Sequence, residues 1–326
     1  MAQRIMDDII DLELEKIEKI IAKIDSDPES EEVKEAEKHL WEKIYKKSGQ
    51  GRRTGVGITA EGDMLAAMGL RYGTEEATEF SEQVHKTIAL EAYRSSVNMA
   101  KERGAFAIYD SEREKNNPFI NRLKEADPEL YEEMKKYGRR NIACLTIAPT
   151  GTTSLMTQTT SGIEPVFMPV YKRRRKVNPN DPQTHVDFVD ETGDAFEEYI
   201  VFHHKFVEWM TVNGYDPTKR YTQEEIDKLV EKSPYYKATS NDVDWLMKVK
   251  MQGRIQKWVD HSISVTINLP NDVDEALVNR LYVEAWRSGC KGCTVYRDGS
   301  RSGVYFLPKR TRKTKKKNFP LANHLR

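Results

Sequence analysis

The chain has 326 residues with 52 basic and 52 acidic side chains, and its zero net charge argues against a general nucleic-acid binder, which is usually basic overall. A composition of 32% charged and 38% hydrophobic residues, with no apolar run near the roughly 20 residues that cross a bilayer, indicates a soluble, helix-rich protein without a membrane partner. The acidic start lacks a signal-peptide core, and three cysteines cannot build a disulfide framework, so a cytoplasmic protein is expected.

A helical segment is expected at the N-terminus, over residues 1–48. Apolar side chains spaced three and four residues apart over 3–25 are typical of an amphipathic helix. Pro28 stops this helix, and a second, very polar helix is expected over 31–47. A glycine-rich loop then leads into the main part of the chain.

The main domain is expected over residues 49–307 and alternates helices with strands. Its strongest helical segment, residues 74–103, has Thr74 as a candidate N-cap and Gly104 as a candidate C-cap. The other expected elements are a helix at 127–138, a strand at 141–149, a short helix after it, an extended segment at 163–171, a polar loop at 178–194, helices at 195–213, 222–232 and 240–252, a β-rich segment at 262–270 and a helix at 272–288. Strands that alternate with helices indicate the α/β class.

The last segment, residues 308–326, is rich in lysine and arginine and is expected to be a disordered basic tail. Such a tail would give only weak, salt-sensitive contact with nucleic acid.

One turn carries a candidate binding site. The predicted strand ends at Pro149, and Thr150, Gly151, Thr152 and Thr153 follow before an apolar segment resumes. The first backbone N–H groups of a helix have no partner and bind anions, small residues let a phosphate approach the main chain, and hydroxyls add donors. The turn is not a P-loop, because the Lys of that motif is absent. An ordinary Ser/Thr N-cap with a tight turn is the alternative reading.

Cys290 and Cys293 form a C-x-x-C pair. This spacing suits a redox or zinc site, but the chain has neither a second C-x-x-C nor a His pair at zinc-finger spacing. Since cysteine is also a common core residue, a structural role is favoured.

Three other polar patterns have weaker claims to function. Residues 260–262, Asp-His-Ser, are adjacent in a predicted strand and point to opposite faces, which excludes a hydrolytic relay. Glu164 is more consistent with a structural salt bridge than with catalysis. The basic run at 172–176 could meet phosphates, but a solvated or inter-subunit run of charges is the commoner case.

Six segments in order give a wider resemblance. They are GRRTGVGITAEGDMLAAMGLRYG, EAYRSSVNMAKERGAF, APTGTTSLM, SGIEPVF, DHSISVTINLPND and GCKGCTVYRDGSR. Together they strongly resemble the large catalytic chain of the adenosylcobalamin-dependent (class II) ribonucleotide reductases, over about residues 1–303. The resemblance implies a helix-rich α/β fold that forms the C-terminal half of a ten-stranded barrel. It also implies reduction of a ribonucleotide to a deoxyribonucleotide by a thiyl radical.

The family also assigns a role to the turn. There it holds the substrate's phosphates through backbone amides and hydroxyls, and the resemblance gives that role to residues 150–153, with Pro149 shaping the turn. It further implies adenosylcobalamin as cofactor, a ribonucleoside di- or triphosphate as substrate, and a thioredoxin-like reductant.

The chain departs from the family at the radical site. The family's Asn-x-Cys-x-Glu loop is absent from this sequence, and Cys144, Cys290 and Cys293 lie in other family segments. No catalytic residue is therefore assigned, and the isolated chain is expected to be inactive. A separate N-terminal chain, or a homo-oligomer, would complete the enzyme. A non-catalytic nucleotide-binding fragment or pseudoenzyme is the alternative.

The residues before the tail bear on the type of reductase. Iron-dependent chains of the family carry adjacent tyrosines there, which relay a radical from a second subunit. Thr294 and Val295 occupy those positions here, and neither side chain can carry a radical. The resemblance therefore favours a locally bound cobalamin.

Overall fold

The structure, a computed structural model, describes residues 1–177, 185–191 and 193–300. The predicted tail at 308–326 lies outside these residues, and so does much of the loop predicted at 178–194. None of the described helices is both long and apolar enough to cross a membrane.

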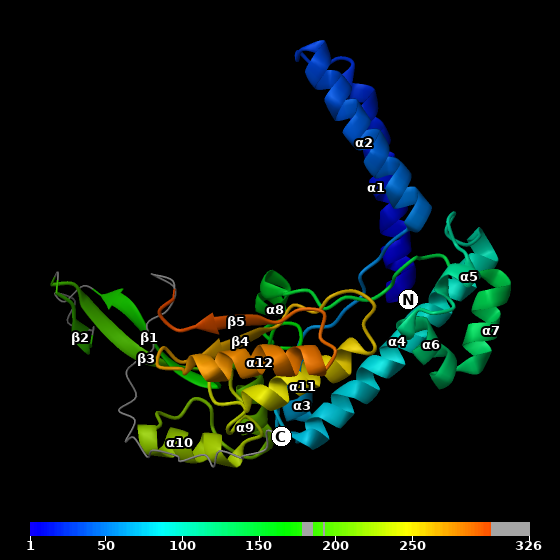
Figure 1. The fold of residues 1–326 in the computed structure, drawn as a ribbon. Coiled ribbons are helices and arrows are strands. Elements are labelled where there is room, and N and C mark those ends of the chain that lie inside the picture. Colours follow the sequence, from blue (N-terminus) through cyan, green and yellow to red (C-terminus); the bar gives the residue numbers. More distant parts are fainter. Residues whose placement is uncertain (178–184, 192, 301–326) are drawn as a thin grey trace.

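The N-terminal helices form a hairpin that projects from the rest of the molecule (Figure 1). Helix α1 spans Ala2–Ile24 and α2 spans Glu31–Gly51, so both predicted helices are confirmed. The hydroxyl of Ser30 accepts a hydrogen bond from Val33 N and caps α2. Ile17 and Ile24 are buried on the face of α1 that meets α2.

The next group of helices includes the long α4. These helices are α3 (Glu61–Ala67), α4 (Glu75–Arg103), α5 (Ser111–Glu114), α6 (Pro118–Ala126) and α7 (Pro128–Tyr137). The expected caps of α4 are confirmed: the hydroxyl of Thr74 accepts from Ala77 N, and the N–H of Gly104 donates to Ala100 O. Sequence patterns gave no expectation for α3, α5 or α6, which are short.

Extended segments lie in parallel beside these helices. Parallel bridges join Val56 to Leu145 and Ile147 to Ile263, and β4 (Thr266–Leu269) pairs in parallel with β5 (Thr294–Arg297). The described residues form no closed sheet, so the structure shows a helix-rich α/β arrangement and does not confirm the predicted half of a ten-stranded barrel. The strand predicted at 141–149 is present only as these bridged positions.

A separate antiparallel sheet overturns one prediction. Its strands are β1 (Val170–Val177), β2 (Phe188–Val189) and β3 (Ala195–Phe202), in the order β1-β3-β2. The helix predicted at 195–213 is therefore wrong in its first half, and only α9 (His204–Val212) is helical. Opposite charges add to the backbone pairing, since Arg174 lies 2.8 Å from Glu198 across the strands. The basic run at 172–176 is exposed, as expected, but it lies in a paired strand.

Three further helices lie in the C-terminal third of the described chain. They are α10 (Gln223–Lys232), α11 (Trp245–Gln256) and α12 (Glu275–Arg287). The first and the last confirm the predictions closely. Helix α11 begins later than expected, because Asp244 caps it by accepting from the N–H groups of Leu246 and Met247.

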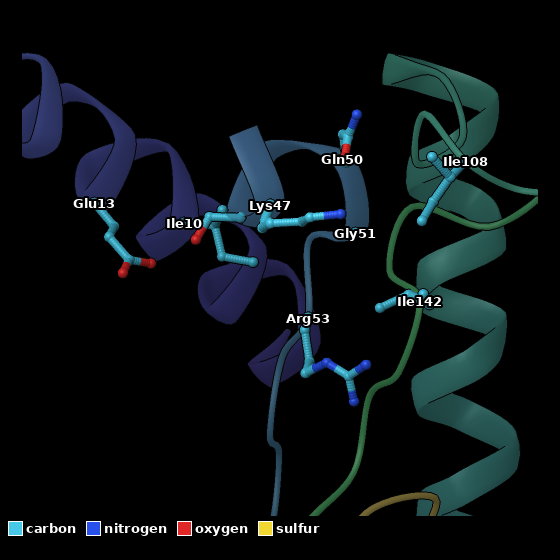
Figure 2. Close-up of a pocket in the computed structure, with 9 residues that line it drawn as sticks. Ile10, Glu13, Lys47, Gln50, Gly51, Arg53, Ile108 and Ile142 are labelled. Carbon is cyan, nitrogen blue, oxygen red and sulfur yellow. The ribbon is translucent and has the colours of Figure 1, made fainter. Parts of the chain in front are cut away.

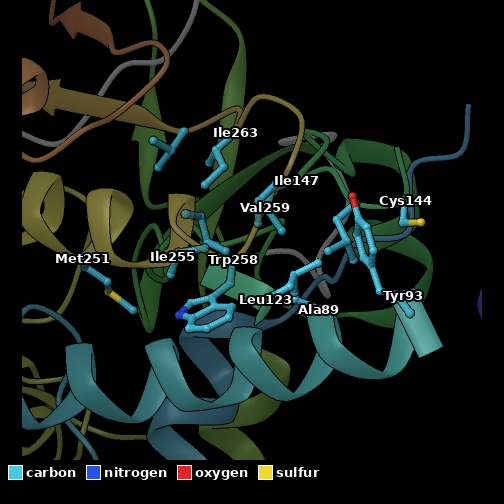
Figure 3. Packing of buried hydrophobic residues seen from close by; sticks show 14 of the residues in the cluster. Ala89, Tyr93, Leu123, Cys144, Ile147, Met251, Ile255, Trp258, Val259 and Ile263 are labelled. Carbon is cyan, nitrogen blue, oxygen red and sulfur yellow. The ribbon is translucent and has the colours of Figure 1, made fainter. Parts of the chain in front are cut away.

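The main hydrophobic core lies where α4 and α11 pack against the parallel segments (Figure 3). Ala89 and Tyr93 come from α4, Ile255 from α11, and Ile147 and Ile263 from two neighbouring parallel segments, and all five are buried. This packing fixes the segment that ends at the predicted turn.

Candidate functional site

The predicted site lies where a buried segment leaves the core. Ile147 is buried, and its carbonyl accepts a hydrogen bond from Ser264 N at 2.8 Å. Ala148 and Pro149, the next two residues, are exposed. The short helix α8 (Gly151–Thr157) then begins at the surface, so the sequence prediction of a strand-to-helix turn is confirmed in outline.

The side chain of Thr150 anchors this turn to neighbouring segments. Its φ of 49° is left-handed, and its side chain does not cap α8. Instead the hydroxyl accepts a 2.7 Å hydrogen bond from Gly162 N and lies 3.1 Å from the hydroxyl of Thr59. The alternative reading, an ordinary hydroxyl N-cap, is therefore wrong at Thr150, because the hydroxyl anchors the turn to two other loops.

The backbone N–H groups of the next three residues have no hydrogen-bond partner within the described chain. Within the described residues, the backbone N–H groups of Gly151, Thr152 and Thr153 make no hydrogen bond, and the first helical bond runs from Ser154 N to Thr150 O. All three residues are exposed, and a Cβ added to Gly151 would meet no atom within 4 Å. Three amides and two threonine hydroxyls can therefore donate to an anion.

Apolar side chains stand beside these donors. Leu155 and Met156, in the next turn of α8, are each 80% exposed. The turn therefore combines open polar donors with an uncovered apolar flank.

Two loops frame the turn. The carbonyl of Thr160 accepts from Ala60 N at 2.9 Å and from the hydroxyl of Thr59 at 2.9 Å. The carbonyl of Gly162 accepts from Glu61 N. Residues 59–63, which include the first turn of α3, and residues 160–164 are thus joined to each other and to Thr150; they are hereafter called the frame loops.

A buried carboxylate fixes one end of this frame. Asp63 is 5% exposed, and its Oδ1 lies 2.8 Å from His203 Nε2 and accepts from the hydroxyl of Tyr235 at 2.9 Å. Its Oδ2 accepts from Thr160 N at 2.8 Å. Burial, together with the charge of Asp63, raises the pKa of Tyr235 far above its usual range, so the phenol stays protonated and donates.

A second carboxylate fixes the other end. Glu164 accepts from Thr266 N at 2.6 Å and from Lys248 Nζ at 2.6 Å, and Lys248 also donates to Thr266 O. The Lys248 side chain is 1% exposed and that of Glu164 is 23% exposed. The sequence-based interpretation of Glu164 as a salt-bridged carboxylate is confirmed.

Sequence reasoning missed Thr59, Asp63 and His203 as parts of the site. Thr59 and Asp63 lie in one of the six segments that carry the family resemblance. No local spacing, however, indicates that their side chains are neighbours of the turn. Their partners lie about a hundred residues away along the chain. The only signal was that GVGITAEGD and SGIEP occur in the same family.

The cysteines are placed in apolar surroundings. Cys144 is fully buried, and burial raises the pKa of its thiol. Burial also raises the pKa of Cys290 to about 12 and that of Cys293 above its usual value, and both pack against the cluster around Ile267. Such thiols hold little reactive thiolate, which agrees with the structural role favoured for the C-x-x-C pair.

Two other clusters are also structural. Asp260 accepts from the N–H groups of Cys144 and Leu145 and from the hydroxyl of Tyr93, so it holds a backbone segment and forms no relay with Ser262. In the described chain the only close acidic cluster is that of Asp7, Asp8 and Asp11. Asp7 lies there in a buried ion pair with Arg52, 2.8 Å away, so arginine neutralises this cluster.

One cavity lies apart from the turn, at the base of the α1–α2 hairpin. It measures about 360 Å³, and Figure 2 shows Ile10, Lys47, Arg53 and Ile142 among the residues that line it. None of the turn residues contributes to its wall. Cobalamin is larger than the drug-sized ligands that fill cavities of about 300–1,000 Å³, so this cavity does not fit that cofactor.

Comparison with known proteins gives a consistent family. A model of the ribonucleotide reductase barrel domain matches residues 4–296. A vitamin B12-dependent ribonucleoside-diphosphate reductase of Mycobacterium tuberculosis strain H37Rv is 30% identical over 268 residues, which cover 79% of this chain and 33% of that protein. A protein of the same name from Thermoplasma acidophilum is 30% identical over 287 residues, 88% of this chain and 33% of that protein.

A solved structure shares the fold. The class Id ribonucleotide reductase alpha subunit of Actinobacillus ureae superposes with a TM-score of 0.52 at 16% identity, over 82% of this chain and 44% of that one. The chain thus spans about a third of the length of the curated relatives described above.

Proposed function

Because the chain belongs to the ribonucleotide reductase barrel-domain family, we propose that it is the C-terminal part of the catalytic barrel of an adenosylcobalamin-dependent reductase. The observation that carries this proposal is the turn at 150–153, whose open amides and hydroxyls stand at a surface position within a chain of this family. The names of the relatives, vitamin B12-dependent reductases, support the choice of cofactor.

The turn is proposed to bind the phosphates of a ribonucleoside di- or triphosphate. Gly151, Thr152 and Thr153 would donate backbone N–H groups to the phosphate oxygens, and the threonine hydroxyls would add donors. Pro149 and Thr150 would shape and anchor the turn. Neutral donors in a preformed arrangement bind an anion without the cost of reorganising the loop.

The remainder of the barrel is proposed to come from elsewhere. The parallel segment at Val56 uses its backbone groups to pair with residues 144–146, whereas the N–H groups of Gly55 and Gly57 have no partner within the described chain. An open parallel edge of this kind is a template for another strand. An N-terminal reductase chain or a second copy of this chain would pair there and, in the first case, supply the Asn-x-Cys-x-Glu loop.

Adenosylcobalamin would supply the radical that begins the reaction, and a thioredoxin-like protein would supply the reducing electrons. No described residue is assigned to either partner. The part proposed for this chain is to bind the substrate phosphates and so hold the ribose at a fixed distance from a radical site on the other part of the barrel.

A reductase assay tests the proposal. The chain is incubated with adenosylcobalamin, a dithiol and a ribonucleoside diphosphate, alone and together with a polypeptide that carries the Asn-x-Cys-x-Glu loop. We expect deoxynucleotide only in the mixture. Nucleotide binding without product in either sample would instead favour the non-catalytic fragment or pseudoenzyme, and product from the chain alone would contradict the proposed division of the barrel.

A further inference from the structure

A buried cluster is linked to the turn through Thr160 without touching the turn directly. We propose that Asp63, held by His203 and Tyr235, is a positioning residue that sets the turn for phosphate binding. This inference rests on the proposed function of the turn and adds residues that the family resemblance did not assign.

The cluster is built around a carboxylate with three donors. His203 Nε2 lies 2.8 Å from Asp63 Oδ1, the hydroxyl of Tyr235 donates to the same oxygen at 2.9 Å, and Thr160 N donates to Oδ2. The bond to Thr160 is reciprocal, because Asp63 N donates to the hydroxyl of Thr160 at 3.3 Å. Since a hydrogen on Nε2 is needed to meet the carboxylate, we assign Nε2 as the protonated nitrogen.

Two routes run from Thr160 to the turn, one through side-chain hydrogen bonds and one along the backbone. In the first, the Thr160 carbonyl accepts from the hydroxyl of Thr59, which lies 3.1 Å from the Thr150 hydroxyl. In the second, Gly162, two residues further along, donates its N–H to the same Thr150 oxygen at 2.7 Å. Because both routes end on Thr150, a shift of Thr160 would move the residue that precedes the open amides.

The donors to Asp63 come from distant parts of the chain. His203 lies between β3 and α9, where it is the N-cap residue of α9 but makes no capping bond with its side chain. Tyr235 follows α10, and its ring packs against that of His203 with centroids 6.1 Å apart. The position of the turn is therefore coupled to the docking of the segment that carries β3, α9 and α10.

The arrangement requires two acceptor oxygens on the Asp63 side chain. An aspartate accepts from all three donors, whereas an asparagine has one acceptor oxygen and brings an NH₂ group toward hydrogens. Asp63→Asn changes the volume of the side chain very little, so its effect reports the loss of acceptors in a buried site.

The experiment compares Asp63→Asn with Asp227→Asn, a matched change at an exposed position of α10. Inorganic pyrophosphate is the probe, and its binding is measured by calorimetry on the full chain. We expect Asp63→Asn to weaken pyrophosphate binding about tenfold or more, because one or more buried donors lose their partner. The Asp227→Asn variant is expected to bind as the parent chain does.

Three further variants separate positioning from a general loss of structure. His203→Gln keeps an N–H donor that can reach Asp63 and is expected to restore most of the affinity that His203→Ala loses. Tyr235→Phe removes one donor without removing the ring and is expected to fall between them. If Asp63→Asn fails to fold, these three variants decide the question. Pyrophosphate affinities equal to that of the parent chain in all three would overturn the proposal.

Hydrogen exchange makes the test independent of the proposed function. Asp63→Asn is expected to speed amide exchange in residues 148–164 and to leave exchange in α4 unchanged. If the parent chain binds no pyrophosphate but this pattern appears, the phosphate site is wrong and the positioning role stands. If exchange in residues 148–164 is unchanged in a folded variant, the positioning role is wrong.

Discussion

The turn at 150–153 and the frame loops behind it differ in how far their polar groups are hydrogen-bonded within the protein. In the frame, Asp63 and Glu164 each accept several hydrogen bonds, and the carbonyls of Thr160 and Gly162 are both paired. In the turn, Gly151 and the two threonines that follow leave their N–H groups open within the described chain. The contrast is typical of a binding site that is rigid around the ligand and unsatisfied toward it.

The largest effect is expected from breaking the frame at Lys248. Lys248→Met leaves the Glu164 carboxylate and the Thr266 carbonyl without a cation in a mostly buried site, and we expect a loss of about 3 kcal/mol in the free energy of unfolding. Urea denaturation measures this loss. Lys228→Met, which removes an exposed lysine from a surface pair with Glu224, is the control and should change little. Equal midpoints for the two variants would show that the frame does not stabilise the fold.

Two glycines give a matched comparison between frame and turn. Gly162 has a φ of 47°, and a Cβ there would lie 3.0 Å from Ala148 O, so Gly162→Ala is expected to cost about 1–2 kcal/mol of stability. Gly151 has open space around it and lies in a helix, so Gly151→Ala should leave stability unchanged or slightly higher. Thermal unfolding of both variants tests this difference, and a larger loss at Gly151 would reverse the comparison.

A pH dependence is expected from Glu61, which joins the frame through its backbone. Its side chain is fully buried and both carboxylate oxygens lack partners among the described residues. Burial raises its pKa above the ordinary value of 4.5, and the charge of His85 opposes part of that rise. The folded chain therefore holds this proton more tightly than the unfolded chain, and stability falls as the pH rises from 4.5 through the raised pKa.

Glu61→Gln removes the titrating group. We therefore expect the free energy of unfolding of this variant to rise relative to that of the parent chain as the pH increases. Urea midpoints from acidic to neutral pH give the two curves. Glu231→Gln, at an exposed position, should run parallel to the parent chain. A curve for Glu61→Gln that is also parallel would mean that Glu61 does not titrate differently in the folded state.

The smallest effect on stability is expected in the turn itself. Thr152 is exposed and its hydroxyl bonds to no described residue, so Thr152→Val should not alter unfolding. Its affinity for a nucleoside diphosphate should fall about threefold to tenfold through the loss of one donor. Calorimetry with Thr211→Val as a surface control measures the change. Unaltered affinity would remove the hydroxyl of Thr152 from the proposed site.

Local sequence patterns were sufficient for the turn and for most helices. The turn follows from a strand end, a proline and small residues, and the caps of α4 follow from Thr74 and Gly104. Such features depend on residues a few positions apart, and this is why they can be read directly.

The contacts of the frame loops could not be predicted from local sequence patterns. Asp63 meets Thr160, His203 and Tyr235 only because the chain folds back on itself, and the three partners lie 97, 140 and 172 residues away. The helix prediction for β3 is wrong for a related reason. Its backbone pairs with β1, an earlier segment of the chain, and cross-strand contacts such as Arg174 with Glu198 cannot be predicted from the spacing within β3.

Amide chemical shifts recorded during a titration with a ribonucleoside diphosphate test the central claim most directly. The claim predicts that the ¹H and ¹⁵N signals of Gly151, Thr152 and Thr153 move in a saturable way, while signals of residues around the cavity at Lys47 and Arg53 stay in place. Shifts confined to that cavity, or no shifts at the turn at saturating nucleotide, would contradict the assignment of the turn as the phosphate site.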